Sequence, residues 1–222
     1  EQIRTEMKND LATAFELLPS SYSGGDLGRA SKWAAAALKA KFHLFDEEWL
    51  LAKGECDEII NNSPHRLLED FASVFDQTNP TDQYNDEQIF AIDFTTDGIY
   101  DYNPRLRDEP NNRNARPGGP GTPTNWELLQ ADLQAVDQDM SGYGWAVPLP
   151  EIANKANWDA DDLRYDATIV TEYLGYQLSF PYYRKNWNLN NSSPRGNHNE
   201  NYIVIRLADI YLMAAEAENE LN

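Results

Sequence analysis

The chain has 222 residues and a formal net charge of −19, because 37 Asp and Glu residues outnumber 18 Lys and Arg residues. A surface this acidic repels phosphate backbones and anionic lipids, which disfavours nucleic-acid and membrane-surface partners. Apolar residues make up 41% of the chain and charged residues 25%, as in a globular protein with a sizeable core. The single cysteine, Cys56, excludes a disulfide framework within the chain and a cysteine-based zinc site.

The first third of the sequence predicts three helices joined by short turns. Apolar residues recur at steps of three and four across residues 3–18, 30–45 and 47–60, the pattern of one buried face on a helix. The four consecutive alanines at 34–37 would let a neighbouring helix approach closely. Such helices in succession indicate hairpins of the tetratricopeptide kind. The predicted fold class is therefore mainly α, with tetratricopeptide-like helical hairpins, long loops and little strand.

A strand and a long irregular segment are expected next. Residues 87–94 have the composition of a strand, whereas residues 95–123 are dense in Asn, Arg, Pro and Gly. A loop of this length inside a compact domain is usually functional when it is ordered. It contains Tyr100, Tyr102 and four arginines, one of them Arg105. We interpret residues 95–123 as the candidate ligand-binding loop.

The second half of the chain predicts three further helices. Residues 124–136 start with a capping-box pattern and continue with an apolar face, and residues 151–156 form a short helix. Residues 173–199 are expected to be extended and loop-like. The last helix, 207–221, carries an apolar face that would need another helix as its partner. The sequence stops at Asn222, so we expect the chain to be truncated at its C-terminus.

Sequence motifs for catalysis are lacking. The chain has no phosphate-binding loop, no dinucleotide-binding glycine pattern, no Gly-x-Ser-x-Gly motif and no His-Glu-x-x-His zinc motif. The three histidines are scattered, and we interpret His43, in the alanine-rich helix, as structural and Cys56 as a small buried hydrophobe. A pair of acids like that of a glycosidase is defined by its spacing in three dimensions, so the many carboxylates leave that possibility open.

An acidic turn is the one weak candidate for a metal site. Carboxylate and amide oxygens of the kind that calcium prefers gather there, on Asn157, Asp159, Asp161 and Asp162. The glycine and glutamate that an EF-hand loop requires are missing from the turn. We therefore favour a solvated turn or a helix cap and expect no cofactor.

Several segments, in chain order, carry the motifs of one known protein family. Residues 28–41, which begin Gly-Arg-Ala-Ser, are similar to its alanine-rich helix, and residues 86–90 to the start of its strand. Residues 142–152 resemble its glycine turn and the helix that follows, and residues 162–164 its Asp-x-Arg element. Residues 202–217 resemble the most specific block of the family. Together these segments resemble the SusD/RagB family of outer-membrane nutrient-binding lipoproteins, and the resemblance covers nearly the whole chain.

The resemblance implies a SusD-like α-α superhelix and a protein that is not an enzyme. It implies a lipoprotein at the extracellular face of the outer membrane that captures oligosaccharides or polysaccharides. The implied partner is a SusC-like TonB-dependent transporter, to which the glycan is delivered. The lipidated cysteine and export signal of the family are missing. We therefore expect residues 1–222 to be a single SusD-like domain from the central part of a longer protein, truncated at both ends.

Glycan sites commonly present aromatic platforms beside amide and guanidinium donors, because sugar rings have apolar C–H faces. On this basis we predict Tyr100, Tyr102 and Arg105 of the long loop to be ligand-binding residues. Trp145, between glycines and a turn, and Trp126, on a helical face, are further candidates. The competing interpretation is that these aromatic side chains only pin the loops to the core.

Other charged residues of the family motifs are interpreted as structural rather than ligand-binding. These are two ion-pair candidates in the last block, Arg206 and Glu216, and two in the Asp-x-Arg element, Asp162 and Arg164. Three functional alternatives stay open: a helical-repeat scaffold that binds proteins, a peptide-capturing member of the same family, and a glycoside hydrolase. An exposed apolar groove would favour the scaffold, and release of reducing ends from a polysaccharide would favour the hydrolase.

Overall fold

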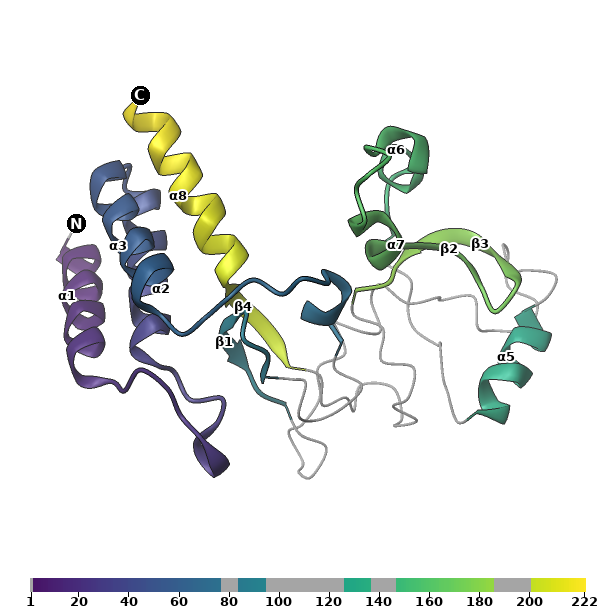
Figure 1. The fold of residues 1–222 in the computed structure, drawn as a ribbon, viewed down its shortest axis with the longest axis horizontal. Coiled ribbons are helices and arrows are strands. Elements are labelled where there is room, and N and C mark those ends of the chain that lie inside the picture. Colours follow the sequence, from purple (N-terminus) through teal and green to yellow (C-terminus); the bar gives the residue numbers. More distant parts are fainter. Residues whose placement is uncertain (1, 77–83, 95–125, 137–146, 186–200) are drawn as a thin grey trace. The chain divides into compact units, whose positions relative to one another are not determined.

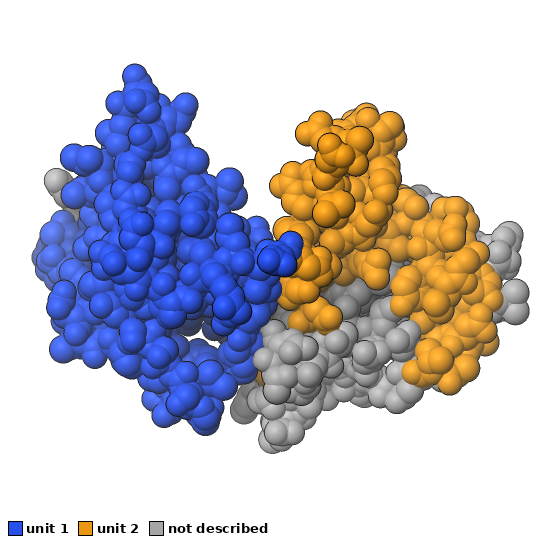
Figure 2. All heavy atoms as spheres, in the orientation of Figure 1, with its two compact units in different colours: residues 1–69, 84–92, 202–222 blue, residues 70–83, 93–201 orange. Residues whose placement is uncertain are grey.

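The structure is a computed structural model that describes five stretches of the chain. These are residues 2–76, 84–94, 126–136, 147–185 and 201–222. The chain divides into two compact units (Figure 2). Unit 1 comprises residues 1–69, 84–92 and 202–222, and unit 2 comprises residues 70–83 and 93–201. The expectation of a single domain stays a prediction.

Unit 1 is built on four helices that pack in series (Figure 1). They are α1 (Gln2–Leu17), α2 (Lys32–Phe45), α3 (Trp49–Asn62) and α8 (Leu207–Leu221). Helix α1 contacts α2, α2 contacts α3, and α3 contacts α8. Consecutive antiparallel helices of this kind form helical hairpins, so the four predicted helices and the mainly α fold class are confirmed.

The alanines of α2 allow the helices of unit 1 to approach one another. Ala36, Ala37 and Ala40 are fully buried, and they share one apolar core with Cys56 and Ile59 of α3. Because these side chains are small, the helices bury little volume between them and their backbones come close. The periodicity was wrong near helix ends: Ile3 of α1 and Phe45 of α2 are each 76% exposed. Phe45 is the last residue of α2, where the chain turns away toward α3.

Cys56 is a buried hydrophobe, as the sequence predicted. Its side chain is fully buried and burial raises the pKa of the thiol to about 12. Only the thiolate is nucleophilic, so we expect iodoacetamide at pH 8 to label Cys56 at least about a hundredfold more slowly in the native protein than in guanidinium chloride. Mass spectrometry of a labelling time course measures both rates. Equal rates under the two conditions would contradict the buried position.

A two-stranded sheet joins distant parts of unit 1. Strand β1 (Gln88–Ile92) pairs antiparallel with β4 (Tyr202–Arg206), and the register is irregular between Gln88 and Phe90. The sequence predicted β1 but not β4, whose β-branched run Ile203-Val204-Ile205 was the available signal. Strand β4 continues directly into α8, so the sheet fixes where that helix begins.

A buried ion pair holds this junction. The Glu87 carboxylate, with its residue 3% exposed, accepts a hydrogen bond from Arg206 Nη1 at 3.3 Å and one from the Leu68 backbone N–H at 3.1 Å. Arg206 also caps α8, since its backbone N–H donates to Asp209 at 3.0 Å. The structural interpretation of Arg206 is thus confirmed. Glu216, in contrast, is exposed and has no ion-pair partner among the described residues, so its structural interpretation stays a prediction.

Unit 2 contains a helix packed on a β-hairpin. Helix α5 (Trp126–Ala135) buries Leu129 and Leu133 against the hairpin of β2 (Ile169–Tyr173) and β3 (Tyr176–Tyr183). The sequence predicted α5 and an extended segment after residue 173, but not the hairpin. Its turn, Leu174-Gly175, has positive φ at both positions (50° and 79°), as tight hairpin turns require. The glycine at the second turn position was the missed signal.

The described part of unit 2 also contains short helical segments. They are η2 (Ala72–Val74), α6 (Pro150–Ala153), η4 (Lys155–Asn157) and α7 (Arg164–Thr168). The single helix expected at 151–156 is thus divided into α6 and η4. The Asn154 side chain caps η4 by accepting the Ala156 N–H at 3.1 Å, which separates the two turns. A further short 3₁₀ turn, η1 (Gly24–Asp26), lies in unit 1 between α1 and α2.

Candidate functional site

The five predicted ligand-binding residues fall where the structure gives no side-chain description. Tyr100, Tyr102 and Arg105 belong to residues 95–125, and Trp145 belongs to residues 137–146, both outside the described residues. Trp126 opens α5, but its side chain is outside the description. The structure therefore describes the residues that flank the candidate segments, and the five assignments stay predictions.

One end of the long loop is fixed by a buried amide. The Phe94 backbone N–H donates to Asn201 Oδ1 at 3.1 Å, and Asn201 is only 1% exposed. Phe94 directly precedes residues 95–125, and Asn201 directly follows residues 186–200. The two residues that flank these segments, Phe94 and Asn201, are thus held side by side in unit 2.

The other end of the long loop runs into the α5–hairpin core. Leu129 and Leu133 are each 1% exposed, and they pack against Val170, Leu178 and Tyr182 of the hairpin. Burial raises the pKa of the Tyr182 hydroxyl to about 12, as expected of a ring within an apolar core. This packing gives the segments on both sides of α5, residues 95–125 and 137–146, a rigid point of attachment.

Aromatic side chains also stabilise the segment that follows residues 137–146. The Trp158 indole donates to the Ile152 carbonyl at 2.8 Å and packs edge-on against Tyr165, with ring centroids 5.5 Å apart. The Tyr165 hydroxyl donates to the Ala153 carbonyl at 2.6 Å. Both polar atoms are therefore used within the fold, and Trp158 and Tyr165 join α6 to α7 rather than offering a platform.

The acidic turn holds the first residue of α7, Arg164, through Asp162. Both carboxylate oxygens of Asp162 bind Arg164, at 2.8 Å from Nε and 2.6 Å from Nη2, and Oδ1 also accepts the Arg164 backbone N–H. These bonds to Arg164 lower the pKa of Asp162 to about 2. The Asn157 amide donates to the Glu151 carbonyl at 2.8 Å. Within the described ranges, no group of three or more His, Cys, Asp or Glu side chains is placed to hold a metal ion.

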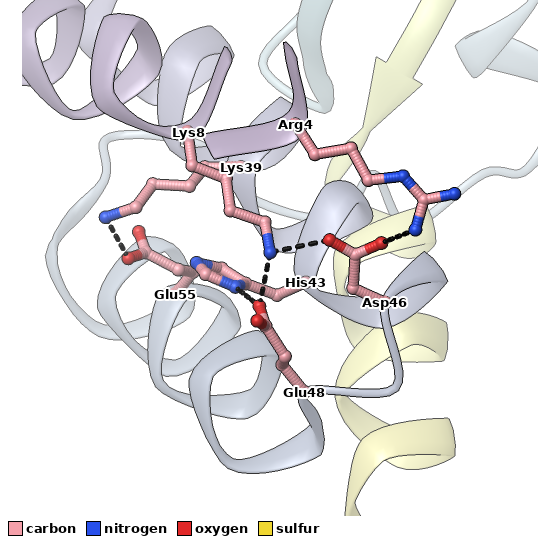
Figure 3. A network of polar contacts seen from close by, with 7 residues as sticks. All are labelled: Arg4, Lys8, Lys39, His43, Asp46, Glu48 and Glu55. Atoms are coloured by element: carbon pink, nitrogen blue, oxygen red, sulfur yellow. Dashed lines mark hydrogen bonds and ion pairs between the residues drawn. The ribbon is translucent and has the colours of Figure 1, made fainter. Parts of the chain in front are cut away.

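A network of charged side chains in unit 1 includes the histidine that the sequence predicted to be structural (Figure 3). His43 is 6% exposed and its Nδ1 lies 2.5 Å from Glu48 Oε2. Lys8 of α1 bridges Glu48 and Asp46, at 2.6 Å from each, and Arg4 binds Asp46 at 2.6 Å. Hydrogen bonding to Lys8 lowers the pKa of both Glu48 and Asp46. Each of these groups has a partner inside the network, and the network joins α1 to the turn between α2 and α3. The structural role of His43 is thus confirmed.

Residues 69–222 match the sequence profile of the SusD family. The chain belongs to the SusD family. SusD-like protein P25 of Formosa agariphila is 40% identical over 248 residues, which cover all of this chain and 44% of that relative. SusD-like protein P2 of the same organism is 26% identical over 236 residues, covering 96% of this chain and 42% of the relative. The chain thus spans less than half the length of these SusD-family relatives.

Solved structures confirm the SusD-like fold. Surface glycan-binding protein A from Bacteroides thetaiotaomicron, in complex with laminarihexaose, superposes with a TM-score of 0.71 at 19% identity, over 98% of this chain and 50% of that one. A laminarin-binding SusD-like protein gives a TM-score of 0.71 at 23% identity, over 98% and 50% of the two chains. At these identities the comparison establishes the architecture of the SusD-family chain. None of its described helices has the length and apolarity needed to span a membrane.

Proposed function

We propose that this SusD-family chain forms part of a non-catalytic surface protein that binds glycans. The observation that carries the proposal is the match, over 98% of the chain, to a surface glycan-binding protein in complex with laminarihexaose. Described side chains are consistent with a binding role, because the histidine, lysine and carboxylates of the charged network satisfy one another and leave no free acid–base pair there. A hydrolase needs such a pair poised on its substrate.

The ligand-binding residues are proposed to be Tyr100, Tyr102 and Arg105, with Trp145 and Trp126 as additional platforms. Phe94, bonded to the buried Asn201, and helix α5 flank the predicted loop 95–123, and both belong to unit 2. The two tyrosines supply the flat faces, and Arg105 supplies guanidinium donors for sugar hydroxyls.

The remaining part of the proposal concerns delivery. We propose that the protein is a lipoprotein on the extracellular face of the outer membrane and passes the bound glycan to a SusC-like TonB-dependent transporter. Membership of the SusD family supports this part of the proposal. Pull-down of the full-length protein from detergent-solubilised outer membranes tests this partner. Recovery of a TonB-dependent transporter is expected, and its absence from stoichiometric complexes would contradict the partnership.

Affinity electrophoresis tests the glycan site. We expect the full-length protein to be retarded in gels that contain laminarin, and the double variant Tyr100→Ala/Tyr102→Ala to lose at least about tenfold in affinity, because each stacked ring contributes about 1 kcal/mol. Gels with xylan and with alginate separate neutral from acidic preference. The matched control is Tyr211→Ala, which removes a tyrosine that is 44% exposed on α8 in unit 1 and should leave retardation unchanged.

Each alternative function predicts a different pattern in the same gels. Retardation that is equal in wild type and the double variant would move the site away from Tyr100 and Tyr102, and Trp145→Ala would be examined next. No retardation in any polysaccharide gel would overturn glycan binding and favour peptide capture or a protein-binding scaffold. Release of reducing ends from a retarding polysaccharide would contradict the non-catalytic assignment.

A further inference from the structure

Unit 1 contains a pocket of about 270 Å³ that lies away from the predicted glycan loop in sequence. It is formed between the connection from α1 to α2 and the start of β1, with a third wall from the residues after α3. The side chains used below come from these three segments and are Tyr22, Leu27, Ser31, His65, Tyr84 and Gln88. All of them belong to unit 1, so the pocket is defined within one compact body.

Two buried polar side chains of the pocket have no hydrogen-bond partner among the described residues. Neither Nε2 nor Oε1 of Gln88 is bonded, although Gln88 is only 8% exposed. The Ser31 hydroxyl, also on a residue 8% exposed, is equally unpartnered. An unsatisfied buried amide or hydroxyl costs about 1–3 kcal/mol, so native proteins retain few of them without a reason.

Neither side chain has the structural role that its position in the backbone usually implies. Ser31 occupies the N-cap position of α2, where a serine normally accepts a backbone N–H of the first turn, yet it makes no such bond. Gln88 opens β1 at the register irregularity opposite Arg206. Bulges of this kind re-aim side chains and occur often beside binding sites. The two unpartnered groups therefore line the same pocket for a reason other than capping or pairing.

The third polar group of the pocket is a neutral imidazole. His65 Nδ1 lies 3.2 Å from the Asp86 carbonyl oxygen, which can only accept, so Nδ1 carries the proton and Nε2 is left as an acceptor. Burial lowers the pKa of His65, which keeps the ring uncharged at neutral pH. The charged residues at the rim are already paired, Arg29 with Asp26 at 2.9 Å and Asp86 with Arg66 at 2.5 Å. The pocket thus offers neutral hydrogen-bonding groups to an occupant.

We propose that this pocket is a second ligand site of the protein and that it binds a small neutral polyhydroxylated molecule, a single sugar ring or polyol. Gln88 Oε1 and His65 Nε2 need donors, whereas Gln88 Nε2 and the Ser31 hydroxyl can donate to acceptors. Vicinal hydroxyl groups supply donors and acceptors together and satisfy all of these atoms without burying a charge. The site is independent of the predicted loop 95–123 and does not rest on the proposed polysaccharide function.

Size and apolar lining agree with this class of ligand. A volume of 270 Å³ is below the range of about 300–1,000 Å³ that is typical of sites for drug-sized molecules, so it suits one ring rather than an oligosaccharide. Tyr22, Tyr84 and Leu27 add apolar surface that can contact the C–H faces of a sugar ring. A carboxylated sugar is excluded on physical grounds, because no unpaired cation among the described lining residues would compensate its buried charge.

Saturation-transfer NMR on the full-length protein tests the site, with glucose, galactose, mannose, xylose and glycerol as neutral probes and glucuronate as the charged probe. At least one neutral probe is expected to bind, and glucuronate is expected to bind at least tenfold more weakly than glucose or galactose. Gln88→Leu is expected to weaken the neutral probe at least tenfold. Because it removes an unsatisfied buried amide, Gln88→Leu should fold with an unchanged or higher melting temperature, so lost binding is not lost folding.

Two controls separate this site from the loop. Gln177→Leu alters an exposed glutamine of β3 in unit 2 and should leave probe binding unchanged. Tyr100→Ala/Tyr102→Ala should also keep the small-molecule signal while losing retardation by polysaccharide. Absence of a signal from every neutral probe, or a signal of equal strength in wild type and Gln88→Leu, would overturn the proposal. Either result would leave the gel test of the proposed function unaffected.

Discussion

Arg206→Met is expected to lower the free energy of unfolding by about 3 kcal/mol, because it leaves the Glu87 carboxylate buried without its cation. The Glu87 side chain is 4% exposed and that of Arg206 is 19% exposed, so solvent screens the pair weakly. The substitution also removes the contact of Arg206 Nε with Asp209 Oδ1 at 3.5 Å, whereas the backbone N–H of residue 206 still donates to Asp209. Urea denaturation of the full-length protein, followed by tryptophan fluorescence, measures the loss.

Two further variants test whether the buried charge is the cause. Glu87→Gln combined with Arg206→Met removes the charge and keeps an oxygen to accept the Leu68 N–H, so it should recover at least about 1 kcal/mol. Arg164→Met breaks an ion pair in which the arginine side chain is 61% exposed and should cost far less, since exposed pairs contribute little. Equal losses for Arg206→Met and Arg164→Met would contradict the role given to burial.

Ile210→Ala is expected to destabilise the protein by about 3 kcal/mol through the cavity it leaves. Ile210 is fully buried in the core that α8 shares with α2 and α3. The alanine-rich helix cannot fill the space, because its backbone already lies close and its side chains have no rotamers with which to repack. The same urea denaturation measures the effect, with the midpoint falling at constant slope.

The matched control lies two residues further along α8. Leu212 is 66% exposed, so Leu212→Ala removes a similar amount of side chain where little apolar contact exists and should change stability by less than about 0.5 kcal/mol. Similar losses for the two variants would show that α8 is not docked through Ile210. The pair therefore tests the helix order of unit 1 directly.

Local patterns in the sequence predicted the helices well. Apolar residues at steps of three and four predicted the positions of α2, α3, α5 and α8. Each of these helices buries one face, and the periodicity indicates which residues lie on it. The family motifs then correctly indicated the SusD fold. Periodicity was less reliable at element ends, as Phe45 shows, since burial there depends on where the chain turns next.

Contacts between distant residues were the part that sequence patterns could not supply. The β1–β4 pairing joins residues more than a hundred positions apart, and neither strand carries a local signal for its partner. The β2–β3 hairpin had such a signal in Leu174-Gly175, which the irregular composition around it obscured. The candidate glycan residues on the predicted loop 95–123 remain predictions, because composition indicates aromatic and guanidinium chemistry but not position.

By itself, the sequence determined the helical fold class, the structural roles of His43 and Cys56, and membership of a family, because these depend on local periodicity and on motifs that lie within short windows. Only the tertiary structure decided that Glu87 and Arg206 meet, and that Gln88, Ser31 and His65 line one pocket. These residues come from separate segments, and their separation in the sequence does not predict their distance in space. Their juxtaposition, and the neutral hydrogen-bonding surface it creates, exists only once the helices and the β1–β4 sheet have packed.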